Sequence, residues 1–169
     1  ALVRRYQGRV FGVTMHYMRD WEEARDMAQE TFIKLYRKLD SLRAGDAFLP
    51  WLIRLARNGC IDRLRKLKVR TPAHSVSIDE GPDIPTGRPS PEEVSVEHWR
   101  AGLLHKALDG LSDQSREIIL LKDIQELKLG QIADMLSLPL GTIKSRSHRA
   151  RIELAEAIQN LDPSFGASG

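Results

Sequence analysis

Residues 129–151 read LGQIADMLSLPLGTIKSRSHRAR, and this stretch decides how the C-terminal part of the chain folds. Its first eight residues have the apolar spacing of a short helix, and Leu-Pro-Leu-Gly at 138–141 is expected to break that helix. A second helix is predicted from about Thr142 to Ile158. A short helix, a tight turn that contains glycine and a basic helix together have the layout of a helix-turn-helix motif.

The second helix of this motif concentrates positive charge, with four basic side chains and no acidic one in residues 144–151. Such a helix enters the major groove of DNA and contacts base edges near its N-terminal end. Arg146 is therefore assigned to a base, and Arg149 and Arg151 are assigned to the phosphate backbone. Lys144, Arg146 and Arg149 are expected on one side of the helix. The candidate DNA-binding residues are Thr142, Lys144, Ser145, Arg146, His148, Arg149 and Arg151.

Charge is unevenly distributed along the chain, although the net charge is only +3. Residues 1–68 hold 15 basic and 8 acidic side chains, residues 69–96 hold 2 and 5, and residues 97–169 hold 9 and 10. Two concentrated basic surfaces indicate a polyanion that is contacted twice, but solvated helix faces explain the charge alone equally well. For residues 144–151, the alternative is an ordinary helical hairpin that has a basic, solvated face.

The composition indicates a two-domain helical protein. Residues 69–96 hold five of the eight prolines and are predicted to be a flexible acidic linker between domains at 1–68 and 97–162, followed by a tail at 163–169. No strand pattern is present, so the predicted fold class is all-α. No apolar run is long enough to insert in a membrane, and the only cysteine, Cys60, is expected to be buried. These features indicate a cytoplasmic protein with no metal site, no cofactor and no catalytic residues.

The N-terminal domain has three predicted amphipathic helices. The first has apolar residues three and four apart from Val3 to Tyr17, and Asp20 with Glu23 resembles a capping pair that starts the second. The third is predicted from about Pro50, after a loop at 40–46. The residues expected on the apolar side of the second helix are Ala24, Met27, Ala28, Phe32, Leu35 and Tyr36.

Two groups of residues in this domain are candidate sites. Asp26, Gln29 and Glu30 form a polar edge above the apolar stripe of the second helix, which indicates a docking face, although paired carboxylates also suit acid–base chemistry. Aromatic residues beside arginines suit unstacked single-stranded bases, whereas core packing is the alternative for Trp51. The members of this second group are Phe48, Leu49, Trp51, Arg54, Arg57, Asn58 and Arg65.

In the C-terminal domain, a helix is predicted around Leu103 to Leu108, and Ser112 or Asp113 is expected to cap the next one. The apolar residues expected inside that second helix are Ile118, Ile119, Leu121 and Ile124.

The sequence resembles the extracytoplasmic-function sigma factors of bacterial RNA polymerase. The resemblance lies in ARDMAQETF at 24–32, in the segment 40–65, and most sharply in PLGTIKSR at 139–146 with HRAR at 148–151. It departs in two respects: the family usually has another short helix before Leu2, which implies a longer native N-terminus, and an apolar residue at the position of Ser147. Ser147 is expected to loosen the packing of the helix or to be free for a phosphate.

This resemblance implies a division of labour. Asp26, Gln29, Glu30 and Phe32 would bind the clamp coiled coil of the polymerase β′ subunit, and the loop around Phe48 would capture flipped bases of the −10 element. The basic helix would bind the −35 duplex while its domain touches the β flap, and the linker would thread toward the RNA exit path. Such factors are usually held inactive by an anti-sigma protein.

Two other functions compete with this interpretation. A stand-alone helix-turn-helix regulator explains the C-terminal half but leaves the docking face unexplained. A serine recombinase needs an activated serine among arginines on an α/β scaffold, whereas the N-terminal domain at 1–68 has one serine, Ser41, and no strand pattern.

Overall fold

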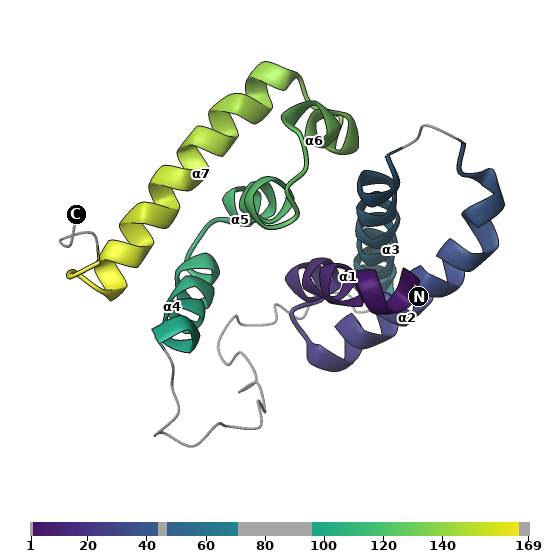
Figure 1. Cartoon of the computed structure of the whole chain (residues 1–169), viewed down its shortest axis with the longest axis horizontal. Coiled ribbons are helices and arrows are strands. Elements are labelled where there is room, and N and C mark those ends of the chain that lie inside the picture. The colour runs from purple at the N-terminus through teal and green to yellow at the C-terminus, as the bar shows by residue number, and fades with distance from the viewer. Residues whose placement is uncertain (1, 44–46, 71–95, 166–169) are drawn as a thin grey trace. The chain divides into compact units, whose positions relative to one another are not determined.

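The computed structural model describes residues 2–43, 47–70 and 96–165, with side chains of the last range described from residue 102 onward. Within these ranges every regular element is a helix, which confirms the all-α prediction (Figure 1). The chain divides into two compact units, residues 1–84 and 85–169. The predicted acidic linker lies outside the described residues except at its ends, where positions 69 and 70 are helical and position 96 begins a helix.

The first unit is built from three helices that pack on one another: α1 (Leu2–Met18), α2 (Trp21–Lys38) and α3 (Phe48–Arg70). A single 3-10 turn, Leu39–Ser41, follows α2. The core consists of one buried stripe from each helix, which stabilises the unit because apolar surface leaves water. Its main members are Val10, Val13, Ala24, Met27, Leu35, Leu52, Ile53 and Ala56.

Local signals in the sequence explain where α2 starts. The side chain of Asp20 accepts a hydrogen bond from the backbone N–H of Glu23 at 2.9 Å, which confirms the predicted cap. The Glu23 carboxylate contacts the Arg63 guanidinium at 3.2 Å, so an ion pair joins the start of α2 to α3. The prediction for Tyr36 is wrong. Its side chain is 84% exposed, because it lies seven residues after Gln29 on the solvent side of α2.

Cys60 is buried as predicted, in the middle of α3. Desolvation by burial raises the pKa of its thiol to about 12, and the nearby Glu30 carboxylate acts in the same direction while Lys34 opposes it. The thiol is therefore an inert part of the core rather than a reactive group.

The second unit contains α4 (Val96–Asp109), α5 (Asp113–Ile119), a single π-helical turn (Leu120–Ile124), α6 (Leu129–Leu136) and α7 (Leu140–Leu161). In this unit α5 packs mainly on α7, and α4 and α6 also contact α7. Ile118, Ile119 and Leu121 are buried as predicted. Ile124 is 45% exposed, because the π turn changes the helical phase and rotates that residue away from the core.

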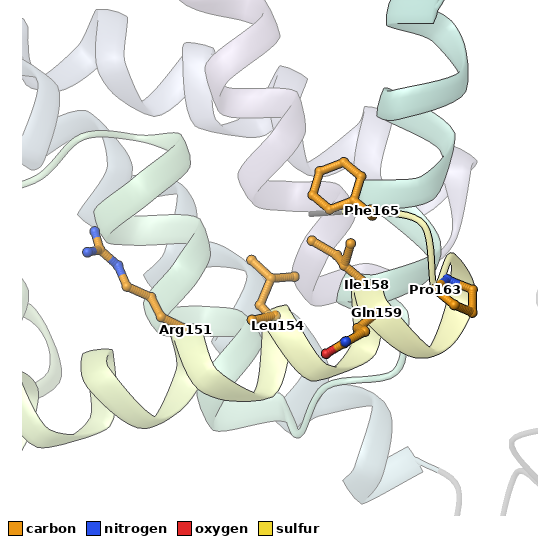
Figure 2. Close-up of a pocket in the computed structure, with 7 residues that line it drawn as sticks. Arg151, Leu154, Ile158, Gln159, Pro163 and Phe165 are labelled. Carbon is orange, nitrogen blue, oxygen red and sulfur yellow. The ribbon is translucent and has the colours of Figure 1, made fainter. Parts of the chain in front are cut away.

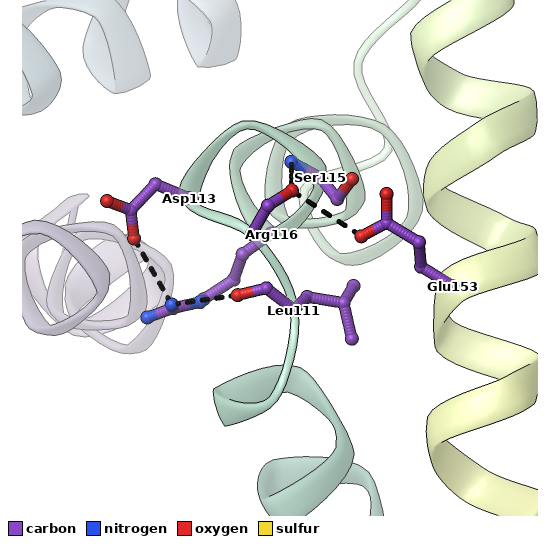
Figure 3. A network of polar contacts seen from close by, with 6 residues as sticks. Leu111, Asp113, Ser115, Arg116 and Glu153 are labelled. Atoms are coloured by element: carbon purple, nitrogen blue, oxygen red, sulfur yellow. Dashed lines mark hydrogen bonds and ion pairs between the residues drawn. The ribbon is translucent and has the colours of Figure 1, made fainter.

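A small polar network fixes the start of α5 (Figure 3). Ser112 is the N-cap, as predicted, since its hydroxyl oxygen accepts from the backbone N–H of Ser115 at 3.3 Å. The same hydroxyl contacts Glu153 of α7 at 3.4 Å, and Arg116 donates to both Asp113 and the Leu111 carbonyl. The cap therefore also joins α5 to α7.

The predicted helix-turn-helix is present as α6 and α7, and α6 has the predicted bounds. The turn differs from the expectation. Its left-handed residue is Ser137 (φ 54°), Pro139 is the N-cap of α7, and Gly141 already lies in the first turn of that helix. Proline's fixed φ suits a helix start, so Pro139 begins the helix instead of prolonging the break.

Candidate nucleic-acid interface

The exposed face of α7 near its N-terminal end consists of Lys144, Ser145, His148 and Arg149. Ser145, His148 and Arg149 share a face because helical residues three and four apart are neighbours. The Ser145 hydroxyl donates to the carbonyl of Thr142 at 3.1 Å, while Thr142 itself is half-buried. This face presents cationic and hydrogen-bonding groups to solvent at the place where a helix-turn-helix contacts base edges.

Arg146 is less exposed than Arg149, its neighbour three residues later in α7. It is half-buried at the start of α5, where it lines a small cavity together with Ser112, Ser115, Glu153 and Arg149. The expectation that Lys144, Arg146 and Arg149 share one side is confirmed for Arg146 and Arg149, which line the same cavity, and is wrong for Lys144. Positions two apart on a helix point in nearly opposite directions, which separates Lys144 from Arg146.

Arg151 has a partner within the unit. Its Nη2 atom donates to the Asp123 carboxylate at 2.5 Å, and this hydrogen bond raises the pKa of the Arg151 guanidinium. The ion pair joins α7 to the π turn. Ser147 is buried, so its hydroxyl is not free for a phosphate, and α7 has a small polar residue where it packs on its neighbours.

Beyond Arg151, α7 has no basic side chain and carries Glu153 and Glu156 among apolar residues. A shallow groove there is lined by Leu154, Ile158, Pro163 and Phe165, with Arg151 at one end (Figure 2). The chain turns back after α7, and the Ser164 backbone N–H and hydroxyl both donate to Asp162. The basic side chains of α7 thus all lie at or before Arg151.

In the first unit, three of the predicted residues share the solvent side of α3. Arg54, Asn58 and Arg65 are exposed and lie four and seven residues apart. Arg65 approaches Asp62 at only 3.9 Å, a contact of little energetic weight at the surface. This face offers two cations and an amide to a ligand.

Arg57 instead contacts α1. Its Nε donates to the Tyr17 hydroxyl at 3.1 Å, and its guanidinium lies 5.9 Å from the centre of the Tyr17 ring. Arg57 is half-buried there, so its contact with α1 supports the packing of α1 on α3.

The aromatic residues at the start of α3 form a cluster with α1. The Phe48 ring lies 5.1 Å from the ring of Tyr6 and 6.2 Å from that of Trp51, measured between centroids. Tyr6, Phe48, Leu49 and Trp51 are all half-buried. The core-packing alternative for Trp51 therefore holds in part, since its ring contacts Phe48 while some of its surface remains open, and its contact with a base stays a prediction.

The exposed side of α2 includes the predicted polar edge. Asp26, Gln29 and Glu30 are exposed, and Glu30 forms an ion pair with Lys34 at 2.8 Å. Phe32, predicted with them, is half-buried beside this edge.

Two apolar residues on the same side of α2 escaped the sequence analysis. Ile33 is 53% exposed, and Tyr36 is the exposed aromatic residue noted above. We define Asp26, Gln29, Glu30, Ile33 and Tyr36 as the α2 face. The spacing of Asp26, Gln29, Ile33 and Tyr36 by three, four and three residues would have revealed it, because this is the repeat of one helical face.

Comparison with known proteins identifies both units. The family model for Sigma-70 region 2 matches residues 2–70, and the one for Sigma-70, region 4 matches residues 101–154. The chain belongs to the sigma-70 family. Among curated relatives, the RNA polymerase sigma-H factor of Pseudomonas aeruginosa is 32% identical over 165 residues, which cover 95% of this chain and 86% of the relative. The ECF RNA polymerase sigma factor SigW of Bacillus subtilis is 32% identical over 92% of this chain and 86% of its own length.

Solved structures share the fold. A sigma factor RpoE in complex with the anti-sigma factor NepR from Bartonella quintana superimposes with a TM-score of 0.70 at 24% identity, covering 94% of each chain. The structure of CnrH in complex with the cytosolic domain of CnrY gives a TM-score of 0.60 at 22% identity, over 95% of this chain and 86% of the other.

This sigma factor is therefore of the extracytoplasmic-function type, and it directs RNA polymerase to promoters. The family matches cover both halves of the chain, which removes the support for a stand-alone regulator and for a recombinase. Among the described residues no helix is long and apolar enough to cross a membrane.

Proposed function

We propose that this sigma factor divides promoter recognition among three surfaces. The α2 face binds the clamp coiled coil of the β′ subunit, and the solvent side of α3 with Phe48 captures the non-template strand of the −10 element. The first half of α7 reads the −35 duplex, while the unit that contains it touches the β flap. The observation that carries the proposal is that each surface is exposed and differs in chemistry from the other two.

The chemistry of α7 supports the −35 assignment. Arginine offers a fork of donors that matches guanine in the major groove, and serine and histidine form hydrogen bonds with bases or phosphates. Ser145, His148 and Arg149 are the exposed members of one face. The half-burial of Arg146 and the ion pair of Arg151 favour Arg149 as the base reader, which reverses the assignment made from sequence position alone.

The composition of the α2 face supports protein docking rather than DNA binding. An exposed isoleucine and tyrosine amid two carboxylates and an amide suit a protein partner, because apolar area gives affinity and carboxylates repel phosphates. Acid–base chemistry has no support from the surroundings of Asp26 and Glu30, which are both exposed on the helix surface.

The solvent side of α3 supports single-strand capture. Arg54 and Arg65 supply the positive charge that follows a phosphate backbone, and Asn58 lies between them on the same side with donor and acceptor groups for a base. Phe48 and Trp51 supply partly open aromatic rings at the start of that side.

Three further statements belong to the proposal. The protein acts in the cytoplasm, where RNA polymerase is found, and catalyses no reaction itself. An anti-sigma protein holds it inactive. The two structural neighbours, each solved with a binding partner, support this last statement.

The experiment that tests the proposal is a run-off transcription assay with bacterial core polymerase on a library of DNA fragments. Core with this protein should give discrete transcripts that core alone does not give. Transcription that is the same with and without the protein would contradict the proposal.

A further inference from the structure

The aromatic cluster joins two elements that are far apart in the sequence. Tyr6 lies in the second turn of α1, and Phe48 is the first residue of α3. Their ring centroids are 5.1 Å apart with an interplanar angle of 59°, a favourable tilted geometry for an aromatic pair. Trp51, one turn later in α3, is the second ring neighbour of Phe48.

The cluster lies at one end of the contact between α1 and α3. Further along both helices, Arg57 donates to the Tyr17 hydroxyl, and the buried Val10, Val13, Leu52 and Ile53 lie between these two contacts in sequence. Tyr6 therefore fastens α3 to α1 at the point where α3 begins. Without that contact, the first turn of α3 is held by backbone bonds such as Trp51 N–H to the Ala47 carbonyl at 3.3 Å.

The orientation of the Phe48 ring follows from this contact. A ring between two other rings has fewer accessible rotamers than one at a free helix end. A ligand that stacks on a ring already held in position does not have to immobilise it, so affinity is gained through preorganisation. The Arg5 guanidinium lies 5.6 Å from the centre of the Tyr6 ring, which adds a cation beside the same cluster.

We propose that Tyr6 is a positioning residue for the −10 strand. Its ring holds Phe48 in the orientation in which Phe48 stacks on a base, and α1 thereby takes part in strand capture without contacting the base itself. The inference rests on the function proposed for Phe48. It goes further because Tyr6 lies outside the sites predicted from the sequence and on a different helix.

The test uses full-length variants assembled with core polymerase. Tyr6→Leu keeps apolar bulk but removes the ring, and Tyr6→Phe keeps the ring but removes the hydroxyl. The matched control is Phe11→Leu, because Phe11 is also half-buried in α1 and pairs with a different ring, that of Trp21, at 4.8 Å. The probe is a fluorescein-labelled single-stranded oligonucleotide with the non-template −10 sequence of a promoter found in the run-off assay.

We expect Tyr6→Leu to weaken oligonucleotide binding about 2- to 12-fold, the range that corresponds to one aromatic pair, with unchanged affinity for core. Tyr6→Phe and Phe11→Leu should bind like the wild type. In a Phe48→Leu background, Tyr6→Leu should have no additional effect, because its role runs through Phe48. Hydrogen exchange in the free protein should be faster at the Trp51 amide in Tyr6→Leu than in Phe11→Leu.

Oligonucleotide affinity of Tyr6→Leu equal to that of the wild type would overturn the inference, as would an equal loss in Phe11→Leu or an additive loss in the Phe48→Leu background. Failure of the proposed function would give a different result. The wild-type holoenzyme would then bind the −10 oligonucleotide no better than a scrambled one.

Discussion

At the scale of single residues, exposure separates basic side chains that the sequence cannot tell apart. Arg146, Arg149 and Arg151 lie within six positions of one helix, yet they differ in surroundings. Arg146 is half-buried beside the start of α5, Arg149 is exposed at the edge of the same cavity, and Arg151 is paired with Asp123. A side chain must reach the groove to read a base, so surroundings as well as position along the helix determine its role.

Arg149→Ala should cost about 1–3 kcal/mol of −35 binding and relax the preference at one or two base pairs, because a bidentate contact with guanine is lost. Arg146→Ala is the matched comparison and should leave the base preference unchanged. The measurement is sequencing of the bound members of a randomised −35 library. If Arg146→Ala relaxes the preference and Arg149→Ala only lowers affinity for all sequences, the assignment from sequence position is right and ours is wrong.

Cys60 gives a prediction on pH. Burial raises the pKa of its thiol in the folded state from the ordinary 9.0 to about 12, so the folded state keeps the proton at pH values where the unfolded chain loses it. The contribution of Cys60 to stability is thus complete below pH 9 and is lost as pH rises toward 12. Between pH 8 and pH 10.5, the unit at residues 1–70 should lose more stability in the wild type than in Cys60→Ala, measured by urea unfolding. Equal losses in both proteins would contradict this account.

At the scale of elements, the α2 face gives the sharpest prediction. Asp26→Lys and Ile33→Asp should each lower co-purification with core polymerase at least tenfold, since each disrupts a surface made of apolar and acidic groups. Helicity should remain unchanged, because both side chains are exposed. Asp62→Lys is the matched control, as it reverses an exposed charge on α3 and should leave co-purification intact. Loss of core binding in all three variants would remove the support for docking through α2.

The start of α3 gives a second prediction. Phe48→Ala should lower open-complex formation by about 1–3 kcal/mol, the value of one lost stacking partner, with a much smaller effect on closed-complex binding. A template with a pre-melted −10 bubble should recover part of the loss, because the cost of separating the strands is then absent. An identical defect on duplex and bubble templates would show that Phe48 does not serve unstacked bases.

The sequence predicted where the helices lie better than it predicted which residues of a helix face the core. Apolar spacing gave the bounds of α6, and capping residues gave the starts of α2 and α5, since both signals are local. Ile124 and Tyr36 were misassigned for different reasons. A π turn rotates the residues after it in a way that no local pattern reports, whereas Tyr36 lies seven residues after Gln29 and so on the solvent side of α2. The break between α6 and α7 was predicted at residues 138–141, but Pro139 is already the N-cap of α7 and the left-handed residue is Ser137.

For the candidate sites, the sequence predicted which helices carry them but not which of their side chains are exposed. Arginine is a residue type that commonly binds DNA, but within this fold Arg57 contacts Tyr17 and Arg151 contacts Asp123. Such pairings join residues 40 and 28 positions apart, so helical periodicity within one element does not reveal them.

At the scale of the whole molecule, the account assigns polymerase docking and −10 capture to the first unit and −35 reading to the second. Variants should therefore separate polymerase docking from −35 reading. Asp26→Lys should abolish transcription on every template, whereas Arg149→Ala should change only which templates are used.

The measurement that tests the central claim most directly is mapping of transcription start sites on a randomised promoter library, with core polymerase and either the wild type or Arg149→Ala. We predict that starts appear only with the sigma factor and that their upstream sequences share two blocks, near −10 and −35. Arg149→Ala should alter the −35 block and leave the −10 block unchanged. Starts that share no upstream sequence, or a variant that alters both blocks equally, would contradict the account.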